Sequence, residues 1–301
     1  MVNQSMDKAG ESYGISVIVP TYNKVELLKR TIDSLLKQTL AAECYEIIVV
    51  DDGSNDSTGE AVKQYQAVHS NIKYLYTPDD GFRVSRARNI GIAAAAKEIL
   101  LLLDSGILAG SRLLETHLIK HYEKFDSVIV GLSHGVEEVA LSASDTIVEL
   151  LQQQTVDKAL DIMTDIPEVQ DCRYDYFKMR NFDIAGFPIP WIIFWAGHVS
   201  LRRRAADRLN GFDEWFTSWG GEDVEFGYRL HQAGHEFVML DQVLSIHYPH
   251  HKNTPHKTSS SSDNLKYMID KHRDRWMTKL LTGSWMSVCE SALAETEKHI
   301  G

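Results

Sequence analysis

The chain has 301 residues, of which 44% are hydrophobic and 24% charged, a composition that indicates a globular protein of one or two domains rather than a disordered one. Its formal net charge of -11 opposes non-specific attraction to nucleic acid or to anionic lipid, so we expect no nucleic-acid partner. The three cysteines, Cys44, Cys172 and Cys289, are odd in number and far apart, which suggests neither a disulfide framework nor a zinc knuckle and favours a reducing cytoplasm.

Membrane and export signals are weak in this sequence. No run approaches the roughly 18 apolar residues that a transmembrane helix needs, and the polar N-terminus lacks the apolar segment of a signal peptide. We therefore predict a cytoplasmic protein with no transmembrane segment, whose contact with a membrane, if any, is peripheral.

Short apolar runs alternate with segments whose apolar residues recur at helical spacing. This alternation is typical of an α/β fold with a mostly parallel central sheet and helices on both faces. The predicted strands are 15–19, 47–50, 72–76 and 99–103, and the predicted helices are 25–38, 57–68 and 84–96.

Three polar clusters follow these apolar strands. They are Thr21-Tyr22-Asn23, Asp51-Asp52-Gly53-Ser54 and Asp104-Ser105-Gly106. Ligands of open α/β sheets bind beyond the carboxyl ends of the strands, so the three loops together predict a nucleotide pocket. Asp52 suits a hydrogen bond to a uracil or ribose edge, with a plain Asp-Gly turn as the alternative. Asp104 suits a ribose or metal contact, with a turn or helix cap as the alternative.

Three arginines, Arg83, Arg86 and Arg88, lie near the start of the predicted helix 84–96. Their cationic side chains could offset the charge of a pyrophosphate, and the alternative is a solvated basic face. We favour phosphate contact for Arg83 and Arg88.

The segment Trp219-Gly220-Gly221-Glu222-Asp223 opens a further helix that ends near Gly234. The two carboxylates lie in its first turn, where the helix dipole favours the ionised form that a general base requires. Helix capping is the alternative, but the two glycines allow close approach of a substrate, so we predict that Asp223 is catalytic.

The rest of the chain is less regular. We interpret 133–179, with helical patches around 147–160, as an acceptor-side insertion, and the Ser-rich stretch 258–262 as a mobile loop before a helix at 265–281. His247 follows a strand-like segment, with His250 and His251 nearby, which predicts metal or phosphate contact unless these histidines are structural.

In combination, these motifs resemble those of inverting family-2 glycosyltransferases of the GT-A (Rossmann-like) fold, over roughly 15–251. Residues 17–23 and 50–54 resemble the nucleotide-binding opening of that family. Gly81-Phe82-Arg83, Arg88-Asn89-Ile90-Gly91 and the segment 219–230 resemble bacterial chondroitin polymerase modules, and the last also resembles the C-terminal half of β-1,4-galactosyltransferases.

The resemblance implies a UDP-sugar donor and transfer to the hydroxyl of a glycan, peptide or small-molecule acceptor. It implies that Asp223 is the base and that Glu222, also in the catalytic site, helps to bind the donor or acceptor sugar. It implies that Thr21, Tyr22 and Asp52 contact the uracil end. The donor-binding residues predicted from motifs and resemblance are Pro20, Thr21, Tyr22, Asp52, Arg83, Arg88, Asp104, Ser105, Gly197, His198, Trp219, Gly220 and Gly221.

The resemblance also implies a divalent cation, Mn²⁺, with Asp104 and His247 as its protein ligands. Gly106 stands where the relatives have a second acidic ligand. Either Asp104 and His247 hold the cation with waters and donor phosphates, or arginines and histidines replace its charge.

The predicted organisation is a disordered N-terminus at 1–14 and a transferase domain at 15–257, followed by a flexible loop and C-terminal helices at 258–301. The domain divides into a nucleotide-binding half, 15–130, and an acceptor and catalytic half, 131–257. The alternative function is a catalytically impaired, nucleotide-sugar-binding partner of another transferase.

Overall fold

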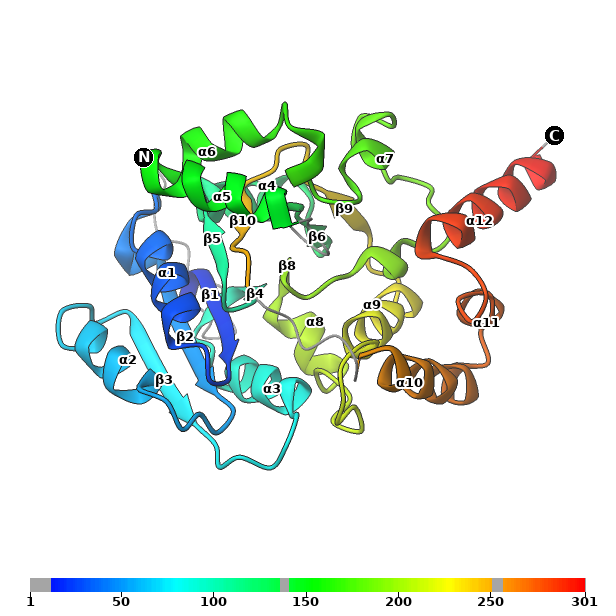
Figure 1. Ribbon diagram of the computed structural model, residues 1–301. Helices are drawn as coiled ribbons and strands as arrows, with labels where there is room; N and C mark the ends of the chain where they lie inside the picture. Colours follow the sequence, from blue (N-terminus) through cyan, green and yellow to red (C-terminus); the bar gives the residue numbers. More distant parts are fainter. Residues whose placement is uncertain (1–11, 136–140, 251–256, 301) are drawn as a thin grey trace.

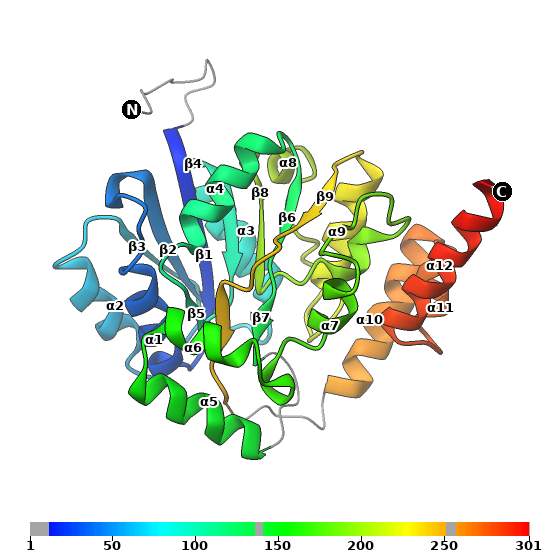
Figure 2. The same ribbon diagram turned by 90° about the horizontal axis from the view of Figure 1, so that it is seen from above.

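The structure is a computed structural model that describes residues 12–135, 141–250 and 257–300. A central sheet of seven strands has the order β3-β2-β1-β4-β8-β6-β9, which can be followed from left to right in Figure 2. Its strands are β1 (Ser12–Thr21), β2 (Tyr45–Asp51), β3 (Ile72–Tyr76), β4 (Lys97–Leu103), β6 (Val128–Val130), β8 (His198–Arg202) and β9 (Phe237–Met239).

The first four strands of the chain pair in parallel, which confirms the predicted mostly parallel sheet. Ile18 of β1 lies between Ile48 of β2 and Leu102 of β4. Among the described strands of this sheet, β8 alone runs antiparallel to its neighbours, β4 and β6. The carboxyl ends of β1, β2 and β4 therefore meet at one edge, where the polar clusters begin.

Both faces of the sheet are covered by helices (Figure 1). Alternate β1 side chains enter different cores: Val17 and Val19 pack with α1, while Ile18 packs with α3. This alternation follows from the period of two along a strand. The helices of this half are α1 (Val25–Leu35), α2 (Thr58–Gln66), α3 (Val84–Ala94) and α4 (Leu113–Glu123), with the 3₁₀ turn η1 (Ala42–Cys44).

A second sheet of three strands lies beside the end of β4, in the order β5-β10-β7. Its core includes Leu108, Ile246 and the helix residues Ile147 and Leu160. The predicted helical patches around 147–160 are confirmed as two helices. The elements are β5 (Ile107–Ala109), β7 (Ser133–His134), β10 (Ser245–His247), α5 (Leu141–Gln153), α6 (Val156–Met163), η2 (Pro167–Val169) and α7 (Tyr174–Lys178).

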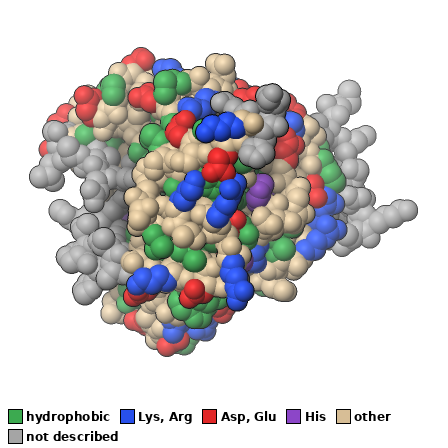
Figure 3. Space-filling model, turned by 90° about the vertical axis from the view of Figure 1, so that its right-hand side faces the viewer, with side chains coloured by type: hydrophobic (Ala, Val, Ile, Leu, Met, Phe, Trp, Pro, Cys, Tyr) green, Lys and Arg blue, Asp and Glu red, His purple; other side chains and the backbone are tan. Residues whose placement is uncertain are grey.

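The second half of the chain continues through η3 (Pro190–Ile193), α8 (Arg203–Arg208) and α9 (Glu222–Gln232) to three C-terminal helices, α10 (Lys257–His272), α11 (Arg275–Lys279) and α12 (Trp285–Ile300). Charges of both signs are interspersed on the side of the molecule shown in Figure 3. Ion pairs fasten α12 to the rest of the chain: Arg180 to Glu290 at 2.7 Å and Arg275 to Glu295 at 2.8 Å.

Three boundary predictions are wrong. Residues 258–262 form the beginning of α10 instead of a mobile loop. The predicted helix 265–281 is interrupted at Arg273, whose φ of 51° lies in the left-handed region. Residues 12–14 belong to β1, and the rest of the predicted disordered N-terminus lies outside the described residues. Among the described helices, none has the length and apolar character needed to cross a bilayer.

Candidate active site

A pocket of about 580 Å³ opens where β1, β2 and β4 end. Its walls come from the loops after these strands, from α1 and α3, and from the start of α9. The lining residues are Pro20, Thr21, Tyr22, Lys24, Leu27, Asp52, Gly81, Phe82, Val84, Ala87, Arg88, Asp104, Ser105, Trp219, Glu222 and His250. The three polar clusters predicted to converge are therefore brought together.

One end of the pocket contains Thr21, Tyr22 and Asp52. The backbone N–H of Asp52 donates to the Thr21 carbonyl at 2.9 Å, which ties the end of β2 to that of β1. Tyr22 is 44% exposed and its hydroxyl donates to Asp79 at 3.0 Å. Asp52 is buried and accepts from the Arg83 backbone N–H at 3.0 Å. Burial raises the pKa of Asp52 above its ordinary value, against the opposing effect of this hydrogen bond.

Arg88 is the central cation of the site. It is buried, and it donates to Asp104 Oδ1 and to Glu222 Oε1, each at 3.0 Å. Burial opposes its charge, but the carboxylates of Asp104 and Glu222 outweigh burial and raise the pKa of the guanidinium. Arg88 thus joins the loop after β4 to the first turn of α9.

Asp223 follows Glu222 but has a different environment. Its carboxylate accepts from the backbone N–H groups of Val224, at 2.8 Å, and Ala196, at 3.4 Å. Burial and the neighbouring Glu222 carboxylate raise the pKa of Asp223 to about 7, although Arg88 acts in the opposite direction. The dipole at the N-terminus of α9 favours the ionised form, and burial together with the like charge of Glu222 opposes it.

The segment Asp104-Ser105-Gly106 lies next to β10. The Asp104 side chain is 44% exposed. The Tyr248 N–H donates to the Gly106 carbonyl at 2.8 Å, and His247 pairs with Ile107 across the two strands. Gly106 has a φ of 102°, a conformation that residues with a Cβ rarely adopt. The missing second acid of the motif therefore coincides with a backbone conformation that favours glycine.

The residues present fit a metal ion only in part. Asp104 offers Oδ2, because Oδ1 accepts from Arg88, and the imidazole of His247 is the second candidate ligand. Within residues 12–135, 141–250 and 257–300, no cluster of three or more metal-ligating side chains occurs. The predicted His251 lies outside these ranges.

Some predicted donor contacts do not line the pocket. Arg83 pairs with Asp80 at 3.1 Å, and its predicted phosphate contact stays a prediction. His198 is buried and its ring is hydrogen-bonded to His117 at 2.8 Å and Ser245 at 2.9 Å, so it is not available to a donor, and this prediction is wrong. Gly197 lies close to Asp104, since a Cβ on it would be 3.5 Å from Oδ2.

The last part of the pocket wall is connected to α9 through the segment Trp219-Gly220-Gly221. Trp219 lines the pocket and is 48% exposed. Gly221 is the N-cap of α9. Asn264 of α10 donates to the carbonyls of Ser218 and Gly220, which fixes this turn.

Sequence reasoning missed Lys24 and Phe82 as pocket residues. Lys24 is exposed at the start of α1, and its side chain has neither an ion pair nor a hydrogen bond with the described residues. Lys24 directly follows Thr21-Tyr22-Asn23, and this position could have predicted it as a pocket residue. Phe82 lies next to Arg83 in the segment Gly81-Phe82-Arg83, of which the sequence analysis predicts only Arg83 as a donor-binding residue.

Several buried polar atoms of the pocket residues lack partners. Within the described part of the chain, these include Thr21 Oγ1, Ser105 Oγ, Arg88 Nε and Glu222 Oε2. Buried polar groups are almost always hydrogen-bonded in folded proteins, so their concentration at one pocket indicates a site prepared for a polar ligand.

Comparisons with known proteins give the family. A model described as "Glycosyl transferase family 2" matches residues 16–209, and one described as "N-terminal domain of galactosyltransferase" matches residues 178–257. The chain belongs to glycosyl transferase family 2.

Named relatives extend the comparison. The chain is 36% identical over 259 residues to a validoxylamine A glucosyltransferase of Streptomyces hygroscopicus subsp. jinggangensis, an alignment that covers 86% of this chain and 61% of the relative. It is 27% identical to the chondroitin synthase of Escherichia coli, over 78% of this chain and 34% of that protein. The chain thus spans less than two thirds of the length of these relatives.

Solved structures confirm the GT-A fold. TarS 1-349 of S. aureus, in complex with UDP-GlcNAc, superposes with a TM-score of 0.60 at 18% identity, covering 86% of this chain and 66% of that one. A mannosyltransferase of Pyrobaculum calidifontis, in complex with GDP-Man and Mn²⁺, gives 0.60 at 18% identity, covering 98% and 79%.

Proposed function

We propose that the chain transfers a sugar from a UDP-sugar to an acceptor hydroxyl with inversion at the anomeric carbon, and that Asp223 is the general base. The observation that carries this proposal is the contrast between two adjacent acids. Glu222 pairs with Arg88 at 3.0 Å, whereas Asp223 accepts hydrogen bonds only from backbone N–H groups among the described residues and has its pKa raised to about 7. A base titrating near the operating pH is the effective one.

The proposed reaction is a single displacement. The acceptor oxygen attacks the anomeric carbon while Asp223 takes its proton, and the bond to the diphosphate oxygen breaks, so that the electron pair leaves with UDP. Glu222, held by Arg88, has its second oxygen, Oε2, unpartnered among the described residues. In this proposal, that oxygen accepts a hydrogen bond from a sugar hydroxyl.

The nucleotide end of the donor would occupy the wall formed by Thr21, Tyr22 and Asp52. Thr21 Oγ1 is buried without a partner among the described residues, and Tyr22 presents a half-exposed ring. An unpaired hydroxyl and an aromatic ring at the end of β1 suit the polar edge and the flat face of a uracil. The relative in complex with UDP-GlcNAc supports a uridine nucleotide.

The diphosphate requires positive charge. We propose that Asp104 Oδ2 and His247 hold a divalent cation together with donor oxygens, and that Lys24, exposed on the pocket wall, adds a direct contact. Such a cation would stabilise the charge on the departing diphosphate.

The experiment is a transfer assay with a panel of UDP-sugars and mixed glycan and small-molecule acceptors, read by UDP release and by the anomeric configuration of the product in NMR. The proposal expects a product of inverted configuration. A retained configuration would contradict it. Donor binding without turnover under any condition would instead support the binding-only alternative.

A further inference from the structure

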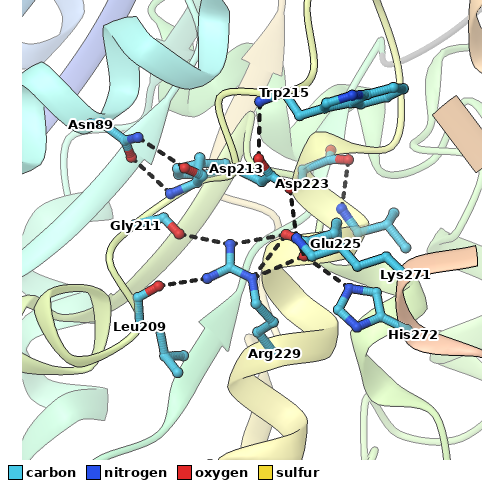
Figure 4. A network of polar contacts seen from close by, with 12 residues as sticks. Asn89, Leu209, Gly211, Asp213, Trp215, Asp223, Glu225, Arg229, Lys271 and His272 are labelled. Carbon is cyan, nitrogen blue, oxygen red and sulfur yellow. Dashed lines mark hydrogen bonds and ion pairs between the residues drawn. The ribbon is translucent and has the colours of Figure 1, made fainter. Parts of the chain in front are cut away.

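Trp215 is an exposed tryptophan held in one orientation. Its indole is 48% exposed, and one face stacks on Tyr267 of α10 with ring centroids 3.6 Å apart and an interplanar angle of 9°. Its backbone N–H donates to Asp213 at 2.9 Å (Figure 4). Tyr267 therefore covers one face of the indole, and Phe216 lies edge-on to it with ring centroids 5.6 Å apart.

A network of partly buried and exposed polar contacts holds this arrangement. Asp213 also accepts from the Tyr267 hydroxyl at 2.7 Å and from Lys271 at 2.6 Å. Lys271 continues to Glu225 of α9, at 2.7 Å, which also accepts from Arg229 at 2.9 Å (Figure 4). Glu225 lies in the same helical turn of α9 as Asp223. The stacked pair of Trp215 and Tyr267, called the Trp215 platform below, is therefore linked through this network to the proposed base.

Two residues of α10 relate Trp215 to the pocket, because one contacts Trp215 and the other contacts the pocket wall. Asn264 contacts Ser218 and Gly220, beside the pocket residue Trp219, while Tyr267 contacts Trp215. Three residues along a helix correspond to about 4.5 Å. The Trp215 platform therefore begins within about one helical turn of the segment that lines the pocket.

Aromatic side chains also surround the pocket itself. Tyr22, Phe82 and Trp219 line it and are 44%, 39% and 48% exposed. Trp215 extends this series beyond the pocket, towards the side where α10 lies. A flat, rigid aromatic face loses little entropy on binding and is suited to the apolar face of a pyranose ring.

We propose that Trp215 forms a second acceptor subsite, which stacks against a sugar or cyclitol ring one or two units away from the ring that carries the attacking hydroxyl. The proposal rests on the proposed transferase function and assigns the acceptor to oligosaccharides or pseudo-oligosaccharides rather than to single rings.

The test compares acceptors of increasing length. Glucose, cellobiose and cellotriose, and likewise GlcNAc, chitobiose and chitotriose, are titrated into the UDP-saturated protein, with the Trp215 indole N–H followed by NMR and affinity by calorimetry. The wild type should bind the longer members about two- to tenfold more tightly, the size expected for one aromatic contact. The Trp215 resonance should shift with these members only.

Three variants of Trp215 distinguish stacking on a sugar ring from packing within the protein. Trp215→Ala and Trp215→Leu should both lose the gain in affinity with length and leave the one-ring probes unchanged, whereas Trp215→Tyr should retain part of the gain. Tyr76→Ala, which removes an aromatic ring that is 55% exposed at the end of β3, is the matched control. Thermal melting checks that the variants are folded.

Results that contradict the Trp215 subsite differ from those that contradict the proposed transferase function. Failure of every probe to bind, absence of a length effect in the wild type, or equal losses for one-ring and longer probes would overturn the subsite. The binding readout does not need turnover, so a chain that bound longer glycans but released no UDP from any donor would contradict the proposed function and leave the subsite standing.

Discussion

Arg88 and Glu222 form an ion pair of 3.0 Å that connects α3 to the first turn of α9. The same guanidinium bonds Asp104, which is far more exposed than Glu222. The pair therefore links the proposed diphosphate side of the pocket to the proposed catalytic side, and its loss should affect both.

Arg88→Met should destabilise the protein by about 3 kcal/mol, since removal of one partner leaves the Glu222 charge buried and uncompensated. In Arg88→Met with Glu222→Gln, much of that loss should be regained. Urea unfolding of the four proteins of this cycle measures the coupling. Strictly additive changes would mean that the pair carries no interaction energy.

The rate should depend on the ionisation of Asp223. Because its pKa is raised to about 7 and a base acts only when deprotonated, kcat/KM should fall as the pH drops through about 7. Glu222→Gln removes a like charge and should shift this acid limb to lower pH. A pH–rate profile of both proteins measures it, and an acid limb near the ordinary aspartate value of roughly 4 in the wild type would contradict the assignment.

Chelation tests the proposed cation. EDTA should abolish transfer and Mn²⁺ should restore it, and His247→Ala should raise the Mn²⁺ concentration needed for half-maximal activity. Full activity after chelation would show that side chains carry the positive charge instead.

Lys24 and Arg83 give a direct comparison between cations. Lys24→Met should weaken UDP binding several-fold, because Lys24 lines the pocket and the described residues pair it with no acid. Arg83→Met should have a smaller effect, since Arg83 pairs with Asp80. Calorimetry measures the affinity of both variants for UDP. A larger loss of affinity in Arg83→Met than in Lys24→Met would contradict the assignment of Lys24 as the diphosphate contact.

Gly106→Asp would restore the acidic position of the motif but should not improve the enzyme. The φ of 102° at this position should make any residue with a Cβ cost about 1–2 kcal/mol. Thermal unfolding and Mn²⁺ titration measure the outcome, and Gly106→Ala serves as the control for backbone strain alone. An unstrained variant that binds Mn²⁺ more tightly would contradict this account.

Local patterns predicted most of the parallel half of the fold. The strand 72–76 was predicted with the bounds that the structure has, because short apolar runs between turn residues report burial directly. The Ser-rich start of α10 was misjudged, because serine only weakly disfavours helices and Asn264 anchors this helix to the turn 218–220.

The candidate site was predicted where motifs sit at strand ends, and less well where partners are distant in sequence. Arg88 and Glu222 are 134 positions apart in the sequence, and no local sequence pattern predicts that they form a pair. His198 was misassigned for the same reason: its partners, His117 and Ser245, come from other elements and bury the ring.

Turnover by Asp223→Asn tests the central claim most directly. The amide keeps the shape of the side chain but cannot take a proton, so kcat should fall by about 10²- to 10⁴-fold while the Kd for UDP stays within about twofold. Asp207→Asn, which changes an exposed acid on α8, should leave both unchanged. Near-wild-type turnover in Asp223→Asn would contradict the account.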